Sequence, residues 1–374
     1  MKKGSKRVLV DAREFVFTRY TGIRRVLEGL TESLVESPFI ESVILATHKV
    51  GAVPSRLKDL EKIRVREIPG DFIKSEKALS VLTREAFDVY LSPYPKLPLF
   101  GCYCEAVHII HDVLDLTHSA YRRRLKVIFD IYRVRKALKK AALTWYDSIW
   151  SMEETKKLTG FAGINPRVRN PGIDERFNNQ RKDNEKQILE KHKLQGGYIV
   201  IIGNGSPHKN LGVILRIRNR VQRQIVFVGV PAINQGYWKS RYPDIKAVWI
   251  ENVADEDLPG ILRNAFCLAQ PSAVEGYGYP PLEAMACGTP AVVSSIPVLI
   301  ETTGGQALGS DPSEPEEWIT AFESLEDEYL YTKQVEKGLK WARPLRGNRG
   351  WKNHVSDMEE LIGMKSEDYS RKGI

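Results

Sequence analysis

The stretch from Pro271 to Pro290 holds the residues of this chain that are best suited to chemistry: two carboxylates, a glycine-rich turn and a helix start. Gly276 and Gly278 allow the backbone to come close to a ligand, because glycine has no Cβ. Glu275 precedes these glycines and Glu283 follows them. One carboxylate therefore belongs to the turn, and the other belongs to the helix that we expect after it.

This expected helix includes Pro281 in its first turn and ends at Gly288. Proline suits the first helical turn, where its missing N–H costs nothing. The unpaired N–H groups and the positive end of the helix dipole should then face whatever lies over the turn, and a diphosphate fits there. The alternative is a strand–turn–helix unit in which Glu275 is a solvated loop acid and Glu283 is a helix-surface acid.

The segment resembles the Glu-x7-Glu motif of retaining glycosyltransferases of the GT-B fold, in particular glycosyltransferase family four. The resemblance implies that Glu275 lies by the donor sugar, as a catalytic residue, and that Glu283 binds the nucleoside ribose. It also implies that the backbone amides between them meet the sugar and the diphosphate. The substrate-binding residues of this turn are then Gly276, Tyr277, Gly278 and Tyr279.

A second glycine turn follows the apolar run 199–202. It departs from a dinucleotide fingerprint, because His208 stands where the third glycine is needed. It resembles the family's glycine-turn motif ending in Arg-Lys-Asn, which implies a phosphate-binding position for Lys209. A lysine at a helix start is electrostatically misplaced unless an anion is nearby. We therefore interpret Lys209 as catalytic, against the alternative of a solvated lysine, and Gly203, Asn204 and His208 as substrate-binding.

Two segments of the first half are also similar to the family. Gly22 matches the glycine loop that approaches the donor diphosphate in relatives, and Arg24 is expected either to contact phosphate or to point to solvent.

His111 and Asp112 end the expected strand 107–111, and ligands bind at strand carboxyl ends in open α/β sheets. Relatives carry His-Asp beside the donor sugar, which implies a catalytic His111 and a substrate-binding Asp112. The alternative is a hydrogen-bonded structural histidine.

The sequence Asp255-Glu256-Asp257 matches the Asp-x-Asp of metal-dependent glycosyltransferases of the other fold. It precedes the expected helix 258–265, where an acid serves as N-cap and complements the helix dipole. We interpret it as capping and expect no metal site, no required divalent metal and no cofactor besides the sugar nucleotide. The four cysteines form no Cys-x-x-Cys pair, so they support neither a disulfide framework nor a zinc site.

The composition is that of a soluble globular protein with two domains: 374 residues, 42% hydrophobic and 28% charged. The basic start resembles the first part of a signal peptide, but Asp11 interrupts its apolar stretch after Val10. No segment approaches the ~18 apolar residues of a membrane span. We therefore expect a cytoplasmic protein.

Short β-rich runs alternate with helical stretches, and the pattern restarts after residue 172, which argues for two doubly wound parallel sheets. The resemblance implies the α/β GT-B fold, with two Rossmann-like domains that face a central cleft. We expect an acceptor-side domain at 1–172, a nucleotide-sugar domain at 173–350 and a last helix at 351–374 that crosses back. The expected strands are 7–10, 43–47, 63–68, 89–92, 107–111, 143–146, 198–202, 225–228, 248–250, 267–270 and 291–294.

The run Tyr121–Ala142 is strongly basic. It lies in residues 1–175, which hold 31 Lys and Arg against 22 Asp and Glu, so the whole net charge of +9 lies in this half of the chain. On a helix, one face of this run is apolar and the opposite face is basic. A core-packed helix with a solvated basic face is one interpretation, and a helix at an anionic membrane surface is the other. Nucleic acid is not expected as a partner, because stacking aromatics are few. The cations of the basic face are Arg122, Lys126, Arg133 and Lys140.

These features together predict a retaining glycosyltransferase that moves a sugar from a nucleoside diphosphate to a hydroxyl acceptor. We expect the acceptor to be a saccharide or a lipid-linked glycan of the cell envelope, and the protein to lie peripherally on the inner face of the membrane. Two alternatives remain open: a nucleotide-sugar epimerase on the same fold, and a non-catalytic nucleotide-sugar-binding subunit.

Overall fold

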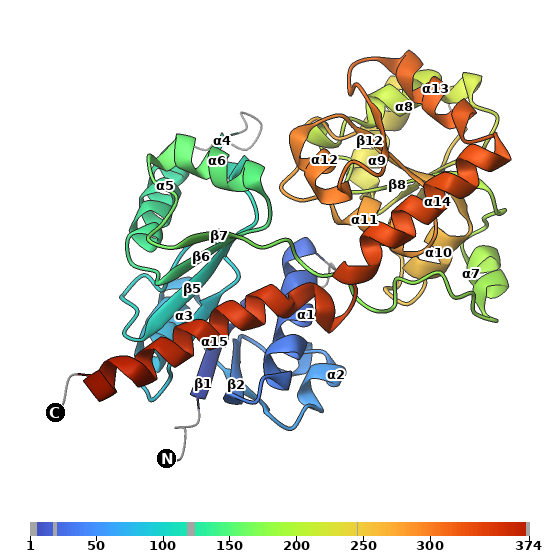
Figure 1. The fold of residues 1–374 in the computed structure, drawn as a ribbon. Coiled ribbons are helices and arrows are strands. Elements are labelled where there is room, and N and C mark those ends of the chain that lie inside the picture. Colours follow the sequence, from blue (N-terminus) through green and yellow to red (C-terminus); the bar gives the residue numbers. More distant parts are fainter. Residues whose placement is uncertain (1–5, 18–20, 118–123, 245, 372–374) are drawn as a thin grey trace. The chain divides into compact units, whose positions relative to one another are not determined.

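The computed structural model describes residues 6–17, 21–117, 124–244 and 246–371, and Figure 1 shows its helices and strands. The chain divides into two compact units. The first unit holds Met1–Gly172 and Gly347–Ile374, and the second holds Ile173–Arg346. The segment that returns to the first unit thus begins at Gly347 rather than at the expected residue 351.

The described residues of the first unit form one sheet of seven parallel strands, in the order β3-β2-β1-β4-β5-β6-β7. The neighbours β1 and β4 are not consecutive in the chain, so the winding direction reverses between them. Ligands bind outside the carboxyl ends of the strands at such a reversal. The strands are β1 (Lys6–Asp11), β2 (Ile40–Thr47), β3 (Ile63–Glu67), β4 (Val89–Ser92), β5 (Glu105–Ile110), β6 (Leu143–Tyr146) and β7 (Pro166–Val168).

Helices connect these strands, and the last helix, α15, lies alongside α1 (Figure 1). The close approach of the two helices depends on Gly29, because a Cβ there would lie 2.6 Å from the Nε1 atom of Trp351. The fully buried Trp145 of β6 donates a hydrogen bond to Asp357 of α15, at 2.9 Å. The helices are α1 (Gly22–Glu36), α2 (Ser55–Lys58), α3 (Phe72–Leu82), α4 (Leu114–Thr117), α5 (Arg124–Leu138), α6 (Ile149–Thr159) and α15 (Asn348–Arg371), with the 3-10 helices η1 (Arg13–Val16) and η2 (Val50–Ala52).

The described residues of the second unit form a sheet of six parallel strands, in the order β10-β9-β8-β11-β12-β13. Here the winding reverses between β8 and β11. The loops after these two strands therefore lie where a doubly wound sheet binds its ligand. The strands are β8 (Tyr198–Ile202), β9 (Ile225–Val228), β10 (Val248–Ile250), β11 (Ala265–Gln270), β12 (Ala291–Ser294) and β13 (Leu308–Ser310).

The core of the second unit lies between its sheet and the helices that carry large apolar side chains, among them Trp318 and Phe322. Continuous apolar strands such as β8 are typical of a parallel sheet covered on both faces. The helices are α7 (Glu185–Lys191), α8 (Leu211–Ile217), α9 (Ala232–Arg241), α10 (Leu258–Arg263), α11 (Tyr279–Ala286), α12 (Pro297–Thr303), α13 (Pro315–Ser324) and α14 (Glu328–Ala342), with the 3-10 helices η4 (Pro207–Lys209), η5 (Arg218–Arg220) and η6 (Arg343–Leu345).

The predicted α/β class with two parallel sheets is confirmed, and each of the eleven predicted strands corresponds to an observed one. The sequence missed β7 and β13. Both are three-residue strands at a sheet edge, and β7 begins with a proline, which is disfavoured in strand interiors. β13 (Leu308–Ser310) contains a glycine, which weakens a strand pattern.

Candidate active site

The first part of the site is the loop after β11, where Glu275 is held in a buried network. Its Oε1 atom accepts hydrogen bonds from Lys209 Nζ, Gln270 Nε2 and Ser272 Oγ, each at 2.6 Å. Burial by itself would raise the pKa of Glu275, but the Lys209 ammonium group and the Ser272 hydroxyl hold that pKa below its ordinary value. Glu275 is therefore a fixed carboxylate with a cation beside it.

The two carboxylates of the Glu-x7-Glu motif are both buried. Glu275 is 6% exposed and Glu283, on α11, is 1% exposed. The alternative of a solvated loop acid and a helix-surface acid is therefore excluded. A buried carboxylate has lost its water, which is costly unless the protein replaces it with hydrogen bonds or charge.

The glycine turn between these carboxylates depends on Gly278. This residue is the N-cap of α11 and has a φ of 94°, and a Cβ on it would lie 2.5 Å from Leu299. α11 begins at Tyr279, earlier in the chain than we expected, and both Pro280 and Pro281 fall in its first turn. Since prolines carry no N–H, an anion over this turn would meet the N–H groups of the turn residues and not those of the helix interior.

The second part of the site is the loop after β8, which meets the first part directly. The backbone N–H of Ala273 donates to the carbonyl of His208, at 2.8 Å. The aliphatic part of the Lys209 side chain lies against Gly203, because a Cβ added to Gly203 would lie 3.5 Å from Lys209 Cδ. Asn204 shapes the turn by accepting from the N–H of Ser206, at 3.0 Å.

The expected position of Lys209 at a helix start is wrong in detail. Lys209 lies in the 3-10 helix η4, and Asn210, with a φ of 50°, separates it from α8. The positive end of a helix dipole does not favour a cation, so Lys209 needs an anion nearby. The Lys209 charge is placed against the Glu275 carboxylate, at the reversal between β8 and β11.

The first unit holds the other predicted site residues, and His111 is the most constrained of them. It directly follows β5, and its ring nitrogens lie 2.7 Å from Asp147 Oδ2 and 3.0 Å from the Pro93 carbonyl oxygen. Burial alone would lower the pKa of His111, but Asp147 and then Asp112 raise it above its ordinary value. The predicted end of β5 is one residue too late, because the strand ends at Ile110.

Asp112 and Gly22 shape the starts of two helices. Asp112 Oδ1 accepts from the N–H of Leu114, the first residue of α4, at 3.0 Å. Gly22 is the first residue of α1, after the N-cap Thr21. Arg24 does not point freely to solvent, because its Nε donates to the buried Glu28 of the same helix, at 2.8 Å.

The capping interpretation of Asp257 is wrong. The residue stands at the N-cap position of α10, but its side chain accepts no hydrogen bond from that helix. Its carboxylate accepts from Lys191 Nζ at 2.6 Å and contacts His192 Nε2 at 3.1 Å. The partners of this carboxylate therefore come from the end of α7 and the residue after it, and not from α10. Among the described residues, no group of three or more His, Cys, Asp or Glu is arranged to hold a metal ion.

Sequence reasoning missed Asp147, Gln270 and Ser272, which hold the predicted residues in place. A signal for Asp147 was present. β5 and β6 are parallel neighbours with Ile110 opposite Tyr146, so the residues that follow the two strands lie side by side. Gln270 likewise ends β11.

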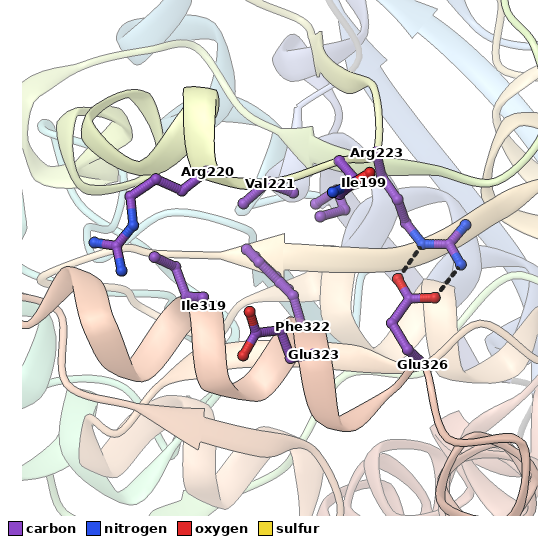
Figure 2. Close-up of a pocket in the computed structure, with 9 residues that line it drawn as sticks. Ile199, Arg220, Val221, Arg223, Ile319, Phe322, Glu323 and Glu326 are labelled. Atoms are coloured by element: carbon purple, nitrogen blue, oxygen red, sulfur yellow. Dashed lines mark hydrogen bonds and ion pairs between the residues drawn. The ribbon is translucent and has the colours of Figure 1, made fainter.

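The second unit also contains a pocket of about 390 Å³ that is remote from these residues. Ile199 at the start of β8 and Val221, before β9, line it together with α13 (Figure 2). At its rim Arg223 pairs with Glu326, at 2.7 Å. The pocket lies at the amino ends of the strands, so it is not part of the site at their carboxyl ends.

Comparison with known proteins identifies the family of the second unit. Residues 181–341 match the family described as glycosyl transferases group 1. The chain is 27% identical over 262 residues to O-antigen chain mannosyltransferase B of Escherichia coli, covering 66% of this chain and 67% of that protein. It is 29% identical over 150 residues to O-antigen chain mannosyltransferase RfbU of Salmonella typhimurium, covering 38% and 42%.

Solved structures share the fold. The crystal structure of Anabaena HepE in complex with UDP-glucose matches with a TM-score of 0.73 and 15% identity, covering 95% of this chain and 99% of that chain. The second unit of this protein therefore carries a glycosyl transferases group 1 domain, in a chain that has the GT-B fold and is homologous to bacterial mannosyltransferases.

Proposed function

We propose that this protein is a retaining glycosyltransferase that moves a hexose from a nucleoside-diphosphate sugar to a hydroxyl of a saccharide acceptor. The observation that carries this proposal is the buried Lys209–Glu275 pair at the reversal between β8 and β11. A cation, a glycine turn and two buried carboxylates at this edge match the needs of a ligand whose diphosphate lies between two groups that carry hydroxyls, the sugar and the ribose.

The proposed reaction breaks the bond between the sugar C1 and the diphosphate oxygen. Both electrons of that bond leave with the diphosphate, and its growing negative charge is stabilised by Lys209 and by the N–H groups of the turn at Gly276–Tyr279. The acceptor hydroxyl attacks C1 on the same face, and its proton passes to the leaving phosphate. Glu275 orients the sugar and Glu283 binds the ribose, as the family resemblance implies.

The same-face route is favoured over a covalent one by the surroundings of Glu275. One of its oxygens already accepts three hydrogen bonds. Such bonds stabilise the carboxylate and make it a weak nucleophile. Glu275 is therefore assigned to positioning the sugar and not to forming a bond with it.

The relatives suggest the sugar. Two of them are named O-antigen chain mannosyltransferases, so a nucleoside-diphosphate mannose is the first donor to test and a growing surface glycan is the first acceptor. The proposal needs no divalent metal.

The acceptor is proposed to be lipid-linked and the protein to be cytoplasmic, held peripherally on the anionic inner face of the membrane. Among the described residues, no helix is long and apolar enough to cross a membrane. The solvent side of α5 exposes Ile128, Phe129 and Tyr132, at 66%, 42% and 58%. Lys126 on α5 and Lys140 just after it are also exposed. Apolar and aromatic groups beside cations suit an interfacial helix.

The basic face differs from the one expected. Arg133 is 4% exposed and donates to the buried Glu76 of α3, at 2.8 Å. The helical period placed it on the solvent side, but an ion pair with another helix holds it inside. Tyr121 and Arg122 lie outside the described residues.

Vesicle binding tests the membrane part. The triple variant of Lys126, Lys139 and Lys140 to Gln is expected to lose most of its co-sedimentation with anionic vesicles, since each cation near such a surface contributes ~1 kcal/mol. A variant with three exposed lysines of α14 changed to Gln is the matched control, and it should bind as the unchanged protein does; its positions are Lys333, Lys337 and Lys340. Equal binding by both variants, or no binding at low salt, would remove the membrane from the proposal.

Product analysis tests the transfer itself. The protein is incubated with a panel of nucleoside-diphosphate sugars and lipid-linked acceptors, and the anomeric configuration of the product is read by NMR. A new linkage with the configuration of the donor supports the proposal, whereas an inverted linkage contradicts retention. An epimerised sugar from donor alone would identify the epimerase instead, and binding without turnover would identify a binding subunit.

A further inference from the structure

The ring of His111 lies between two groups that can only accept hydrogen bonds. Nε2 is 3.0 Å from the backbone carbonyl oxygen of Pro93, and Nδ1 is 2.7 Å from a carboxylate oxygen of Asp147. A carbonyl has no proton to give, and an ionised carboxylate has none either. Both ring nitrogens must therefore donate, which requires the doubly protonated imidazolium.

Three neighbouring strands build this arrangement. Pro93, His111 and Asp147 each directly follow a strand, and these strands, β4, β5 and β6, are adjacent in the sheet. Ser151 of α6 fixes the backbone as well, because its hydroxyl donates to the His111 carbonyl at 2.6 Å. The charged groups that act on the ring are Asp147 and, more weakly, Asp112.

A second histidine on the same strand shows what burial does without a carboxylate. His108 of β5 is fully buried and contacts the Thr144 hydroxyl at 2.8 Å. Desolvation lowers the pKa of His108 to about 3, so this ring is neutral at physiological pH. His111 differs from it by the carboxylate beside Nδ1.

We propose that Asp147 is a positioning residue that keeps His111 as an imidazolium, and that His111 serves the transfer as a fixed positive charge and not as a proton acceptor. A ring whose two nitrogens both donate has no lone pair with which to take the proton of an acceptor hydroxyl. In the proposed reaction that proton goes to the leaving phosphate, so no base is needed at His111. The role of His111 in the transfer rests on the proposed function, whereas its protonation state does not.

Replacing Asp147 by Asn separates charge from shape. The Asn amide nitrogen can donate to Nδ1 while Nε2 still donates to the Pro93 carbonyl, so a neutral ring keeps both hydrogen bonds. Asp115→Asn is the matched control, because it removes the same charge from an exposed position on α4. We expect D147N to stay folded with a neutral His111 at pH 7.

The test combines NMR of nitrogen-15-labelled histidine with steady-state kinetics over pH. At pH 7, wild type and D115N should show His111 with two protonated nitrogens and His108 as a neutral ring, and D147N should show both rings neutral. D147N should lose about tenfold or more in kcat with little change in the donor KM, the magnitude typical of a group that acts in the transition state. In wild type, kcat should fall as the pH rises through the His111 titration.

Two results would overturn the inference. A neutral His111 in wild type at pH 7 would show that Asp147 does not keep the ring as an imidazolium. An unchanged kcat in D147N with a neutral ring would show that the charge does not serve the transfer. If wild type transferred no sugar at all, the proposed function would fail, while the NMR result would still decide the protonation state.

Discussion

Changing Lys209 to Met removes the cation beside Glu275 while keeping most of the aliphatic side chain that lies against Gly203. The two side chains of the pair are 19% and 8% exposed, with 2.6 Å between Nζ and Oε1. A hydrogen bond to a charged group contributes about 1.5–3 kcal/mol. Glu275 keeps Gln270 and Ser272 as donors, so the loss should be smaller than the ~3–5 kcal/mol of a fully stranded buried charge. We expect the free energy of unfolding to fall by about 2 kcal/mol at pH 7.

The pH dependence follows from the direction of the pKa shift. The pKa of Glu275 in the folded protein is below its ordinary value, so the stabilisation is present above the unfolded-state pKa and is lost as pH falls through the folded-state pKa. Without Lys209 the pKa of Glu275 should rise. The stability difference between wild type and K209M should therefore be largest at neutral pH and shrink as the pH falls below about 4.

Urea unfolding of wild type, K209M, E275Q and the double variant measures the coupling of the pair as a double-mutant cycle. The control cycle uses Lys186 and Glu190, an exposed pair at 4.0 Å whose side chains are 88% and 66% exposed. Such surface pairs contribute about 0–1 kcal/mol. A coupling between Lys209 and Glu275 no larger than that of the control, or one that does not change with pH, would show that Lys209 does not stabilise the Glu275 carboxylate.

Three further predictions concern the donor site. Glu283→Ala should weaken donor binding, measured by calorimetry, because Glu283 is assigned to the ribose. Glu275→Ala should mainly lower kcat, because Glu275 is assigned to the sugar. Wild-type affinity and wild-type kcat in both variants would contradict these assignments. Gly278→Ala should lower stability and donor affinity more than Gly305→Ala, since both glycines have positive φ, 94° and 66°, but only the first would push a Cβ against Leu299; equal losses in thermal unfolding would refute the close contact. Transfer should persist in excess EDTA, and loss of activity that magnesium or manganese restores would reverse this expectation.

Local patterns were sufficient for much of the fold. Val89–Ser92 and Leu143–Tyr146 were predicted with their observed bounds, because a short apolar run between polar segments identifies a strand buried on both faces. The site at β8 and β11 follows from glycine turns placed after such strands. The start of α11 was misplaced because Gly278, and not a proline, ends the turn.

Contacts between elements were not predictable from local spacing. Helical periodicity placed Arg133 on a solvent face, but Glu76 comes from a distant part of the chain and holds the guanidinium inside. Asp257 had the position of a cap, and its partner Lys191 lies on another helix. Both errors have one cause: a charged side chain bonds to the best partner in three dimensions, and the sequence does not show which partner that is.

The loops after β8 and β11 are proposed to bind a diphosphate through Lys209. Calorimetric titration measures this binding, with the nucleoside diphosphate that the donor panel selects and with the matching nucleoside, which lacks the phosphates. We predict that K209M binds the nucleoside diphosphate at least about tenfold more weakly than wild type, which is ~1.4 kcal/mol, and binds the nucleoside with unchanged affinity. Equal affinity of wild type and K209M for the nucleoside diphosphate would show that Lys209 does not bind the diphosphate.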